Sequence, residues 1–229
     1  MPDASTVWIV IPALNEARTI GDVVAPLVAR GWRVVVVDDG SRDATAVAAR
    51  AAGGVVLRHA LNLGQGASLR TGFAFVQRQR DAEIVVTYDA DGQHQPDSVA
   101  ALLDVLGRSG GDVALGSRFL DGSAGAHVPA ARRALLRLAT VFTRVTTGLH
   151  VTDAHNGLRA FTVPAVARLR LTHNRMAHAS EMLSEIARLG LRYAEAPVTI
   201  RYTDYSMAKG QRPLDAIVIL WDIFTAGLR

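Results

Sequence analysis

The chain contains no cysteine among its 229 residues. This absence excludes disulfide bonds, thiolate metal sites and cysteine nucleophiles. It is also typical of proteins that work in a reducing compartment, so we expect a cytoplasmic protein.

Long apolar segments are also missing. The longest apolar run, residues 216–221, stops at Asp222 and is far shorter than the roughly 18 to 20 residues that span a bilayer. The first ten residues, MPDASTVWIV, have no basic segment ahead of their apolar stretch, unlike a secretory signal. We therefore expect a protein that is neither exported nor membrane-spanning.

The glycine-rich phosphate loops of several nucleotide-binding classes are absent as well. The loop after the first predicted strand reads PALNEA, which is neither GxGxxG nor GxxxxGK[ST]. This disfavours dehydrogenases, kinases and nucleotidyltransferases. The seven histidines form no His/Glu zinc motif, and we expect only His94 near a functional site.

The net charge of +4 is unevenly distributed along the chain. Residues 1–115 hold 10 arginines and 13 acidic residues, a net charge of −3, whereas the remainder has a net charge of +7. The basic half favours an anionic partner. Its basic residues are not interleaved with stacking aromatics, so we expect a phosphate-bearing small molecule or a membrane surface and no nucleic acid.

Residues 7–116 alternate short β-branched runs with helical patterns. The expected strands are VWIVI, RVVVV, VVLR, EIVVTY and DVALG, and the expected helices are 19–30, 43–52, 65–78 and 96–106. Beyond them we expect helices at 130–147, 164–169, 177–189 and from Pro213, with strands at 158–161 and 193–201. The pattern predicts an α/β fold with a mainly parallel central sheet flanked by helices, formed as a single domain over 1–229.

Acidic residues stand at two of the predicted strand ends, where parallel sheets bind ligands. Asp89, Asp91 and Gln93 follow one strand, and such oxygen ligands suit Mg²⁺ or Mn²⁺ with a diphosphate. Asp38 and Asp39 follow another, where a carboxylate can accept hydrogen bonds from a base or a ribose hydroxyl. The alternatives are an acidic turn that caps the helix at 96 and a turn with an N-cap at DDGS.

The motifs PALNEA, VVVVDDGSRDAT, NLGQGASLRTG, YDADGQHQP, GSRF, DAHNGLRAF and SEML lie in this order along nearly the whole chain. With them the chain resembles family-2 glycosyltransferases, in the polyprenyl-phosphate sugar transferase branch typified by dolichyl-phosphate mannose synthase. A chance match to several linked motifs is much rarer than a match to one. The resemblance implies a GT-A, Rossmann-like fold with a nucleotide-sugar-binding half (1–116) and an acceptor-binding half (117–229).

The resemblance also implies site residues. The donor site would comprise Pro12, Leu14, Glu16, Val37, Asp39, Ala90, Asp91 and Gln93. Asp89, Asp91 and Gln93 would surround the metal, and Arg118, Arg132, Arg133, Arg201 and Lys209 would meet acceptor phosphate groups. Asp89, Asp91 and Arg118 are the expected catalytic residues.

The chain departs from the family pattern in three places. Leu14 replaces an aromatic residue, which leaves the choice between a UDP- and a GDP-sugar open. The helix after GSRF lacks a hydroxyl one turn after its arginines, where Arg137 is a substitute, and Lys209 lies further from Arg201 than usual.

The expected reaction is an inverting, in-line transfer of a hexose to a lipid phosphate, which needs cations and no general base. A soluble or polysaccharide hydroxyl acceptor would instead need Asp153 or Glu181 as base, unless these acids only pair with arginines. A third interpretation is a catalytically inactive scaffold for a membrane partner.

The last helix carries an apolar stripe within 214–228, which either packs on the core or docks on a membrane. We expect peripheral attachment to the inner face of the membrane, with a small membrane-protein partner as a further expectation.

Overall fold

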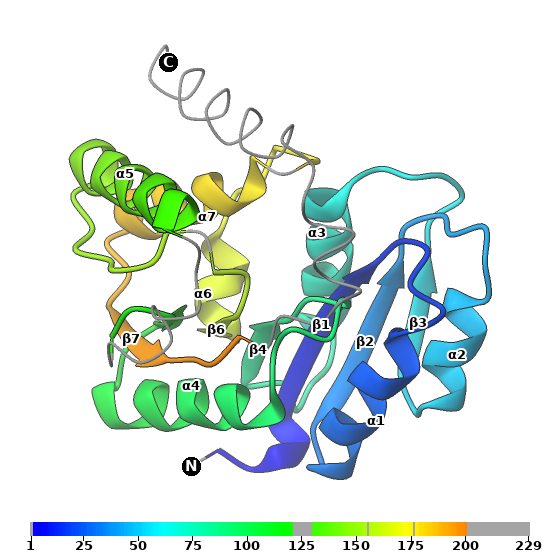
Figure 1. Cartoon of the computed structure of the whole chain (residues 1–229). Coiled ribbons are helices and arrows are strands. Elements are labelled where there is room, and N and C mark those ends of the chain that lie inside the picture. Colours follow the sequence, from blue (N-terminus) through cyan, green and yellow to red (C-terminus); the bar gives the residue numbers. More distant parts are fainter. Residues whose placement is uncertain (1, 121–129, 155, 176, 201–229) are drawn as a thin grey trace.

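The computed structural model of the chain describes residues 2–120, 130–154, 156–175 and 177–200, with only the backbone for 130–136 (Figure 1). The strands are β1 (Val7–Ala13), β2 (Arg33–Asp38), β3 (Val55–Arg58), β4 (Ile84–Thr87), β5 (Val113–Ser117), β6 (Arg159–Thr162) and β7 (Tyr193–Pro197). The helices are α1 (Ile20–Ala29), α2 (Thr45–Ala51), α3 (Gln65–Val76), α4 (Pro96–Ser109), α5 (Ala130–Thr147), α6 (Val163–Arg168) and α7 (His178–Arg188), after a 3-10 turn at Ala4–Thr6.

The seven described strands form one sheet in the order β3-β2-β1-β4-β6-β5-β7. All neighbouring pairs are parallel except those of β6, which runs antiparallel to both β4 and β5. The sheet is therefore mainly parallel, as predicted. Because β1, β2, β4 and β5 run in the same direction, the loops that follow them lie at a common edge of the sheet.

Helices cover both faces of the sheet (Figure 1). On one face, α1, α2 and α4 pack on the side chains of alternate strand residues such as Ile9, Ile11 and Val36. On the other face, α3, α6 and α7 pack on the intervening residues, such as Val10 and Val35. This burial of successive side chains on opposite faces explains why the strands read as continuous apolar runs.

The observed elements match the predicted ones closely, with one difference at β7. The predicted strand 193–201 ends at Pro197, because its neighbour β5 ends at Ser117 and offers no further backbone partner. Ile200 forms only an isolated antiparallel bridge with His94. The helix expected from Pro213 lies outside the described residues, and no helix in the described part of the chain is long and apolar enough to cross a bilayer.

Candidate active site

The loop after β1 is tied to the loop after β2. Asn15 adopts a positive φ of 55°, which turns the chain sharply after Leu14. Its backbone N–H donates to Ser41 Oγ (2.9 Å), and its side-chain Oδ1 accepts from Arg42 N (2.9 Å). The Glu16 N–H donates to Thr45 Oγ1 (2.8 Å). These bonds explain why PALNEA and DDGS act as one structural unit.

The same loop reaches the end of β4. The Thr19 hydroxyl lies 3.1 Å from Glu16 Oε2 and 2.9 Å from the Ala90 carbonyl oxygen. The predicted donor residues Glu16 and Ala90 are thereby brought together, although they are far apart in sequence. Pro12 lines a pocket that also contains Asp89.

Asp39 holds the loop between β3 and α3. Its carboxylate accepts from the N–H groups of Leu63 (3.0 Å) and Gly64 (2.7 Å) and lies 2.7 Å from His59 Nδ1. Asp39 is 4% exposed and Val37 is completely buried. Both residues lie at the predicted end of β2, and their contact with a donor nucleotide stays a prediction.

Asp89 and Asp91 lie just beyond β4, as predicted. The Asp89 side chain is partly exposed, and its two oxygens lie 3.2 Å from Gln65 Nε2 and from His94 Nε2. Asp91 Oδ1 accepts from the backbone N–H of Gln93 (3.0 Å). The carboxylates are thus oriented by an amide, an imidazole and a backbone group.

The two carboxyl groups have opposite pKa shifts. Burial raises the pKa of the Asp91 carboxyl above its usual value, and the negative charge of Asp89 raises it further. Burial acts in the same direction on Asp89, but the hydrogen bond from His94 and nearby cationic groups including Arg159 hold the pKa of Asp89 below its usual value. A carboxyl destabilised by a neighbouring carboxylate is a place where a cation is favourable.

This arrangement fits a divalent ion that is bound together with a diphosphate. The described residues contain no cluster of three His, Asp or Glu side chains able to hold a metal by themselves. Mg²⁺ sites in phosphate-handling enzymes commonly use one or two carboxylates and fill the remaining positions with phosphate oxygens and water. Asp89 and Asp91 supply such a pair, and Gln93 lies two residues further on.

A small pocket beside Asp89 contains residues that the sequence did not single out. It is lined in part by Gln65, Arg159 and His178. His178 Nδ1 lies 2.8 Å from the Arg175 carbonyl oxygen and therefore carries the proton, while burial lowers the pKa of His178 and favours the neutral ring. The sequence pattern around His178 did not predict its position beside Asp89. The two residues are far apart in the sequence, and the fold brings them to the same pocket.

Arg159 on β6 is the buried cation of this pocket. Its guanidinium donates to the carbonyl oxygens of Asn156, Ala179 and Ala154 at 3.1 to 3.4 Å. Burial lowers the pKa of Arg159 to about 10, so it stays charged at neutral pH. It provides a fixed positive charge near Asp89.

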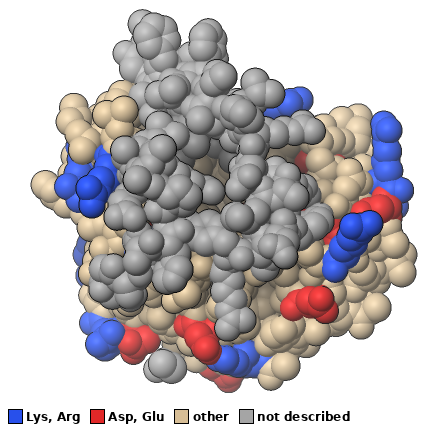
Figure 2. All heavy atoms as spheres, viewed as in Figure 1, with Lys and Arg blue, Asp and Glu red and all other residues tan. Residues whose placement is uncertain are grey.

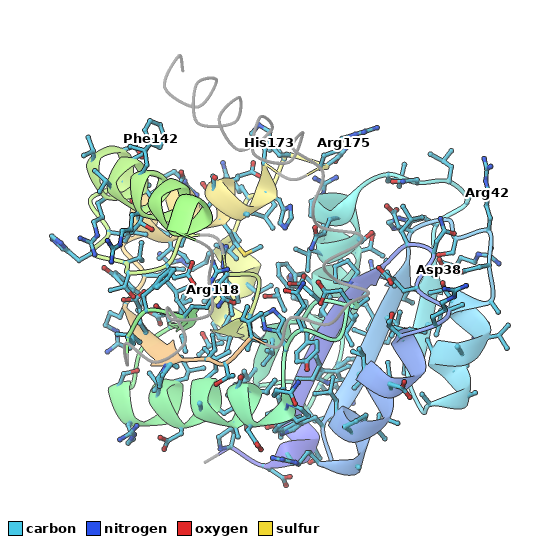
Figure 3. All side chains as sticks on the ribbon, viewed as in Figure 1. Asp38, Arg42, Arg118, Phe142, His173 and Arg175 are labelled. Carbon is cyan, nitrogen blue, oxygen red and sulfur yellow. The ribbon has the colours of Figure 1, made fainter. Side chains whose placement is uncertain are left out.

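Arg118 follows β5 and lies beneath α5 and α7, on the opposite side of the site from Asp38 (Figure 3). Its Nε and Nη2 atoms donate to the two Asp153 oxygens at 2.6 and 2.7 Å, and both residues are about 95% buried. A guanidinium paired in this way has a fixed orientation. Asp153, a candidate base, is therefore engaged with an arginine.

Glu181, the other candidate base, stabilises a turn before α7. Its carboxylate accepts from Thr172 N, Thr172 Oγ1 and His173 N at 2.6 to 3.0 Å, and these bonds keep the pKa of Glu181 below its usual value against the effect of burial. Of the other predicted acceptor residues, Arg132 and Arg133 belong to α5, where only their backbone is described. Arg201 and Lys209 lie outside the described residues.

Comparisons with known proteins show the family of the chain. The model of the family described as "Glycosyl transferase family 2" matches residues 8–170. An uncharacterized protein of Methanocaldococcus jannaschii is 34% identical over 95% of this chain and 90% of its own length. A UDP-N-acetylglucosamine–dolichyl-phosphate N-acetylglucosaminyltransferase of Methanococcus voltae is 30% identical over 89% of each chain.

Solved structures share the fold. Glucosyl-3-phosphoglycerate synthase from Mycobacterium tuberculosis, in complex with UDP, has a TM-score of 0.71 at 22% identity and covers 96% of this chain and 79% of its own. The same synthase has also been solved with Mn²⁺, UDP and glucosyl-3-phosphoglycerate.

Proposed function

The chain belongs to glycosyl transferase family 2, and from this premise we propose that it transfers a hexose from a nucleotide diphosphate sugar to a polyprenyl phosphate. As a member of the family it is a glycosyltransferase with a GT-A fold. The observation that carries the proposal is the Asp89–Asp91 pair at the end of β4, beside the joined loops of β1 and β2.

In this proposal the donor lies along the carboxyl edge of β1, β2 and β4. The nucleoside is held by the loop residues Pro12, Leu14 and Glu16 together with Asp39. Asp89, Asp91 and Gln93 hold Mg²⁺ or Mn²⁺, which would neutralise the charge that develops on the departing diphosphate. The solved synthase with Mn²⁺ and UDP supports this choice of cofactor by its shared fold alone.

The proposed acceptor is a lipid phosphate, as the name of the relative from Methanococcus voltae states for that protein. A lipid monophosphate has a second pKa of about 6 and is largely dianionic at neutral pH, so its oxygen attacks the anomeric carbon without a base. Arg118, Arg132 or Arg133, Arg201 and Lys209 are the proposed phosphate-binding cations. Their task is to hold the oxygen in line with the leaving diphosphate, which gives inversion.

A hydroxyl acceptor is less well supported. It would need a carboxylate to take the proton, and the two candidates, Asp153 and Glu181, are engaged with Arg118 and with the turn before α7. We further propose that the enzyme acts at the cytoplasmic side of a membrane. A small membrane-protein partner stays a prediction.

The decisive experiment screens UDP- and GDP-sugars with Mn²⁺ or Mg²⁺ against a short polyprenyl phosphate and its unphosphorylated alcohol. We expect transfer to the phosphate only, and a loss of at least about a hundredfold in Asp91→Ala, because one metal carboxylate is gone. Asp104→Ala is the matched control, since Asp104 pairs with Arg108 on the surface of α4. It should leave the rate unchanged.

Two results would overturn the proposal. Efficient transfer to the alcohol would favour a hydroxyl acceptor, and near wild-type turnover in Asp91→Ala would remove the metal role. A protein that binds the nucleotide sugar but turns over none of the acceptors offered would instead behave as the scaffold.

A further inference from the structure

The carboxylate of Asp39 has nearly exhausted its hydrogen-bonding capacity within the protein. Its Oδ1 lies 2.7 Å from His59 Nδ1 and accepts from the Leu63 N–H (3.0 Å), and its Oδ2 accepts from the Gly64 N–H (2.7 Å). A carboxylate accepts about two hydrogen bonds on each oxygen. Among the described residues, these partners fill both positions on Oδ1 and leave one position free on Oδ2.

His59 is fixed in the orientation that occupies Oδ1. An ionised carboxylate only accepts hydrogen bonds, so His59 Nδ1 carries the proton and donates to Asp39. At the other side of the ring, His59 Nε2 lies 2.9 Å from Thr71 Oγ1 on α3. The imidazole therefore cannot turn away from Asp39 without losing both of these contacts.

The loop that supplies the other two donors is also fixed. A Cβ atom added at Gly40 would lie 2.7 Å from the backbone carbonyl carbon of Leu61, and one added at Gly64 would collide with the Asn174 carbonyl oxygen. The same oxygen accepts from the Gly66 N–H (2.8 Å) at the start of α3. Because backbone atoms enclose this loop on both sides, it does not release the positions that it fills on Asp39.

Asp39 lies where the proposed function places the base of the donor. Its backbone N–H donates to the Ala13 carbonyl oxygen (2.8 Å), which puts Asp39 beside the β1 loop that contains Leu14. Figure 2 shows basic and acidic side chains near one another over α1 and α2, so the surface charge there does not distinguish nucleotides that share a diphosphate. The choice between two bases therefore depends on hydrogen bonds at the edge of the base.

Uracil and guanine offer different numbers of donors to a carboxylate. Guanine presents two adjacent donors, the N1–H and the 2-amino group, which pair with the two oxygens of one carboxylate. Uracil presents a single donor, the N3–H imide, between two carbonyl groups. A carboxylate with one free position satisfies uracil but leaves one guanine donor buried without a partner, which lowers the affinity by about tenfold or more.

We propose that His59 is a specificity-determining residue, which occupies Asp39 Oδ1 and thereby selects a donor whose base has a single imide N–H, such as uracil, over guanine. The inference rests on the proposed function, because it takes the nucleoside to lie at Asp39. It concerns binding of the nucleotide and not transfer of the sugar, so it is measurable without an acceptor.

Isothermal titration calorimetry with UDP and with GDP, each in the presence of Mn²⁺, tests the inference on the full chain. We expect the wild type to bind UDP at least about tenfold more tightly than GDP. His59→Leu removes the donor and frees a position on Oδ1, so the ratio of the two affinities should fall by about tenfold. His59→Asn supplies an amide N–H in place of Nδ1 and should retain most of the selectivity.

The ratio of the two affinities separates selection of the base from support of the loop. A residue that only stabilises the loop would weaken UDP and GDP binding equally, and the ratio would stay the same. His150→Leu is the matched control, because His150 is an exposed histidine between α5 and β6. Both affinities should be unchanged in this variant.

The outcomes distinguish this inference from the proposed function. GDP binding as tight as UDP binding, or an unchanged ratio in His59→Leu, would overturn the role of His59 and leave the proposed transfer intact. Transfer from a GDP-sugar as efficient as from the UDP-sugar would do the same. Failure of the wild type to bind either nucleotide would overturn both, because the donor site itself would then be wrong.

Discussion

At the scale of single residues, the structure pairs two residues, Arg118 and Asp153, for which the sequence suggested separate roles. Arg118 was expected to bind phosphate and Asp153 was considered as a base, but they form a buried, bidentate ion pair. Removal of one partner from such a pair leaves an uncompensated charge in a poorly solvated place. The pair therefore fixes the orientation of Arg118.

We expect Asp153→Asn to lower the free energy of unfolding by about 3 kcal/mol, because it leaves the Arg118 charge buried without its carboxylate. Urea denaturation measures this change. Asp97→Asn is the control, since Asp97 makes an exposed ion pair with Arg30 and should cost less than about 1 kcal/mol. Equal losses in the two variants would contradict the view that burial makes the difference.

Some site residues could be predicted from the sequence and others could not. The position of Asp89 and Asp91 at the ligand-binding edge of the sheet was predictable, because both residues directly follow an apolar run that forms a strand. Arg118 and Asp153 are 35 positions apart, and no local pattern links them. His178 was missed for the same reason, since its place in the pocket depends on how α7 packs and not on its sequence neighbours.

At the scale of elements, the loop before β6 lies against the carboxylate of Asp89, a proposed metal ligand. Thr87 Oγ1 donates to the Gly157 carbonyl oxygen at 2.6 Å, which holds this loop on β4. A Cβ atom added at Gly157 would lie 2.5 Å from Asp89 Oδ2. Only glycine leaves room for the carboxylate in its present orientation.

Gly157→Ala should therefore displace the Asp89 carboxylate and weaken Mn²⁺ binding in the presence of nucleotide by about tenfold or more. Isothermal titration calorimetry measures this affinity. Gly107→Ala is the matched control, because a Cβ at this helical position meets nothing within 4 Å. It should keep the affinity and raise stability by up to about 1 kcal/mol. Unchanged Mn²⁺ affinity in Gly157→Ala would show that Asp89 does not bind the metal.

The individual elements were well predicted because hydrophobic periodicity reports burial directly. The order of the strands in the sheet was not predicted. The residues of β6 read only as a short strand, and its apolar pattern would be the same beside any neighbour. Its antiparallel position between β4 and β5 is a property of the assembled sheet.

At the scale of the whole molecule, the proposed donor and metal should stabilise the fold together. A ligand at a hundred times its dissociation constant adds about 2.7 kcal/mol, which corresponds to a rise in Tm of roughly 5 to 10 °C for a chain of this size. We expect this rise with a nucleoside diphosphate plus Mn²⁺, measured by differential scanning calorimetry. Chelation of the metal should abolish most of it, and Asp91→Ala should show little rise. A full rise under chelation would mean that the nucleotide binds without metal.

The position of β6 also matters while the chain is being made. β4 and β5 leave the ribosome well before residues 159–162, yet in the finished sheet these residues separate them. At about 5 to 20 residues per second, the nascent chain spends several seconds with two apolar strand edges that have no correct partner. During that interval, direct pairing of β4 with β5 would trap a misassembled sheet. We therefore expect slower translation across residues 118–158 to lower the yield of folded protein, which expression with slow synonymous codons in this segment would measure.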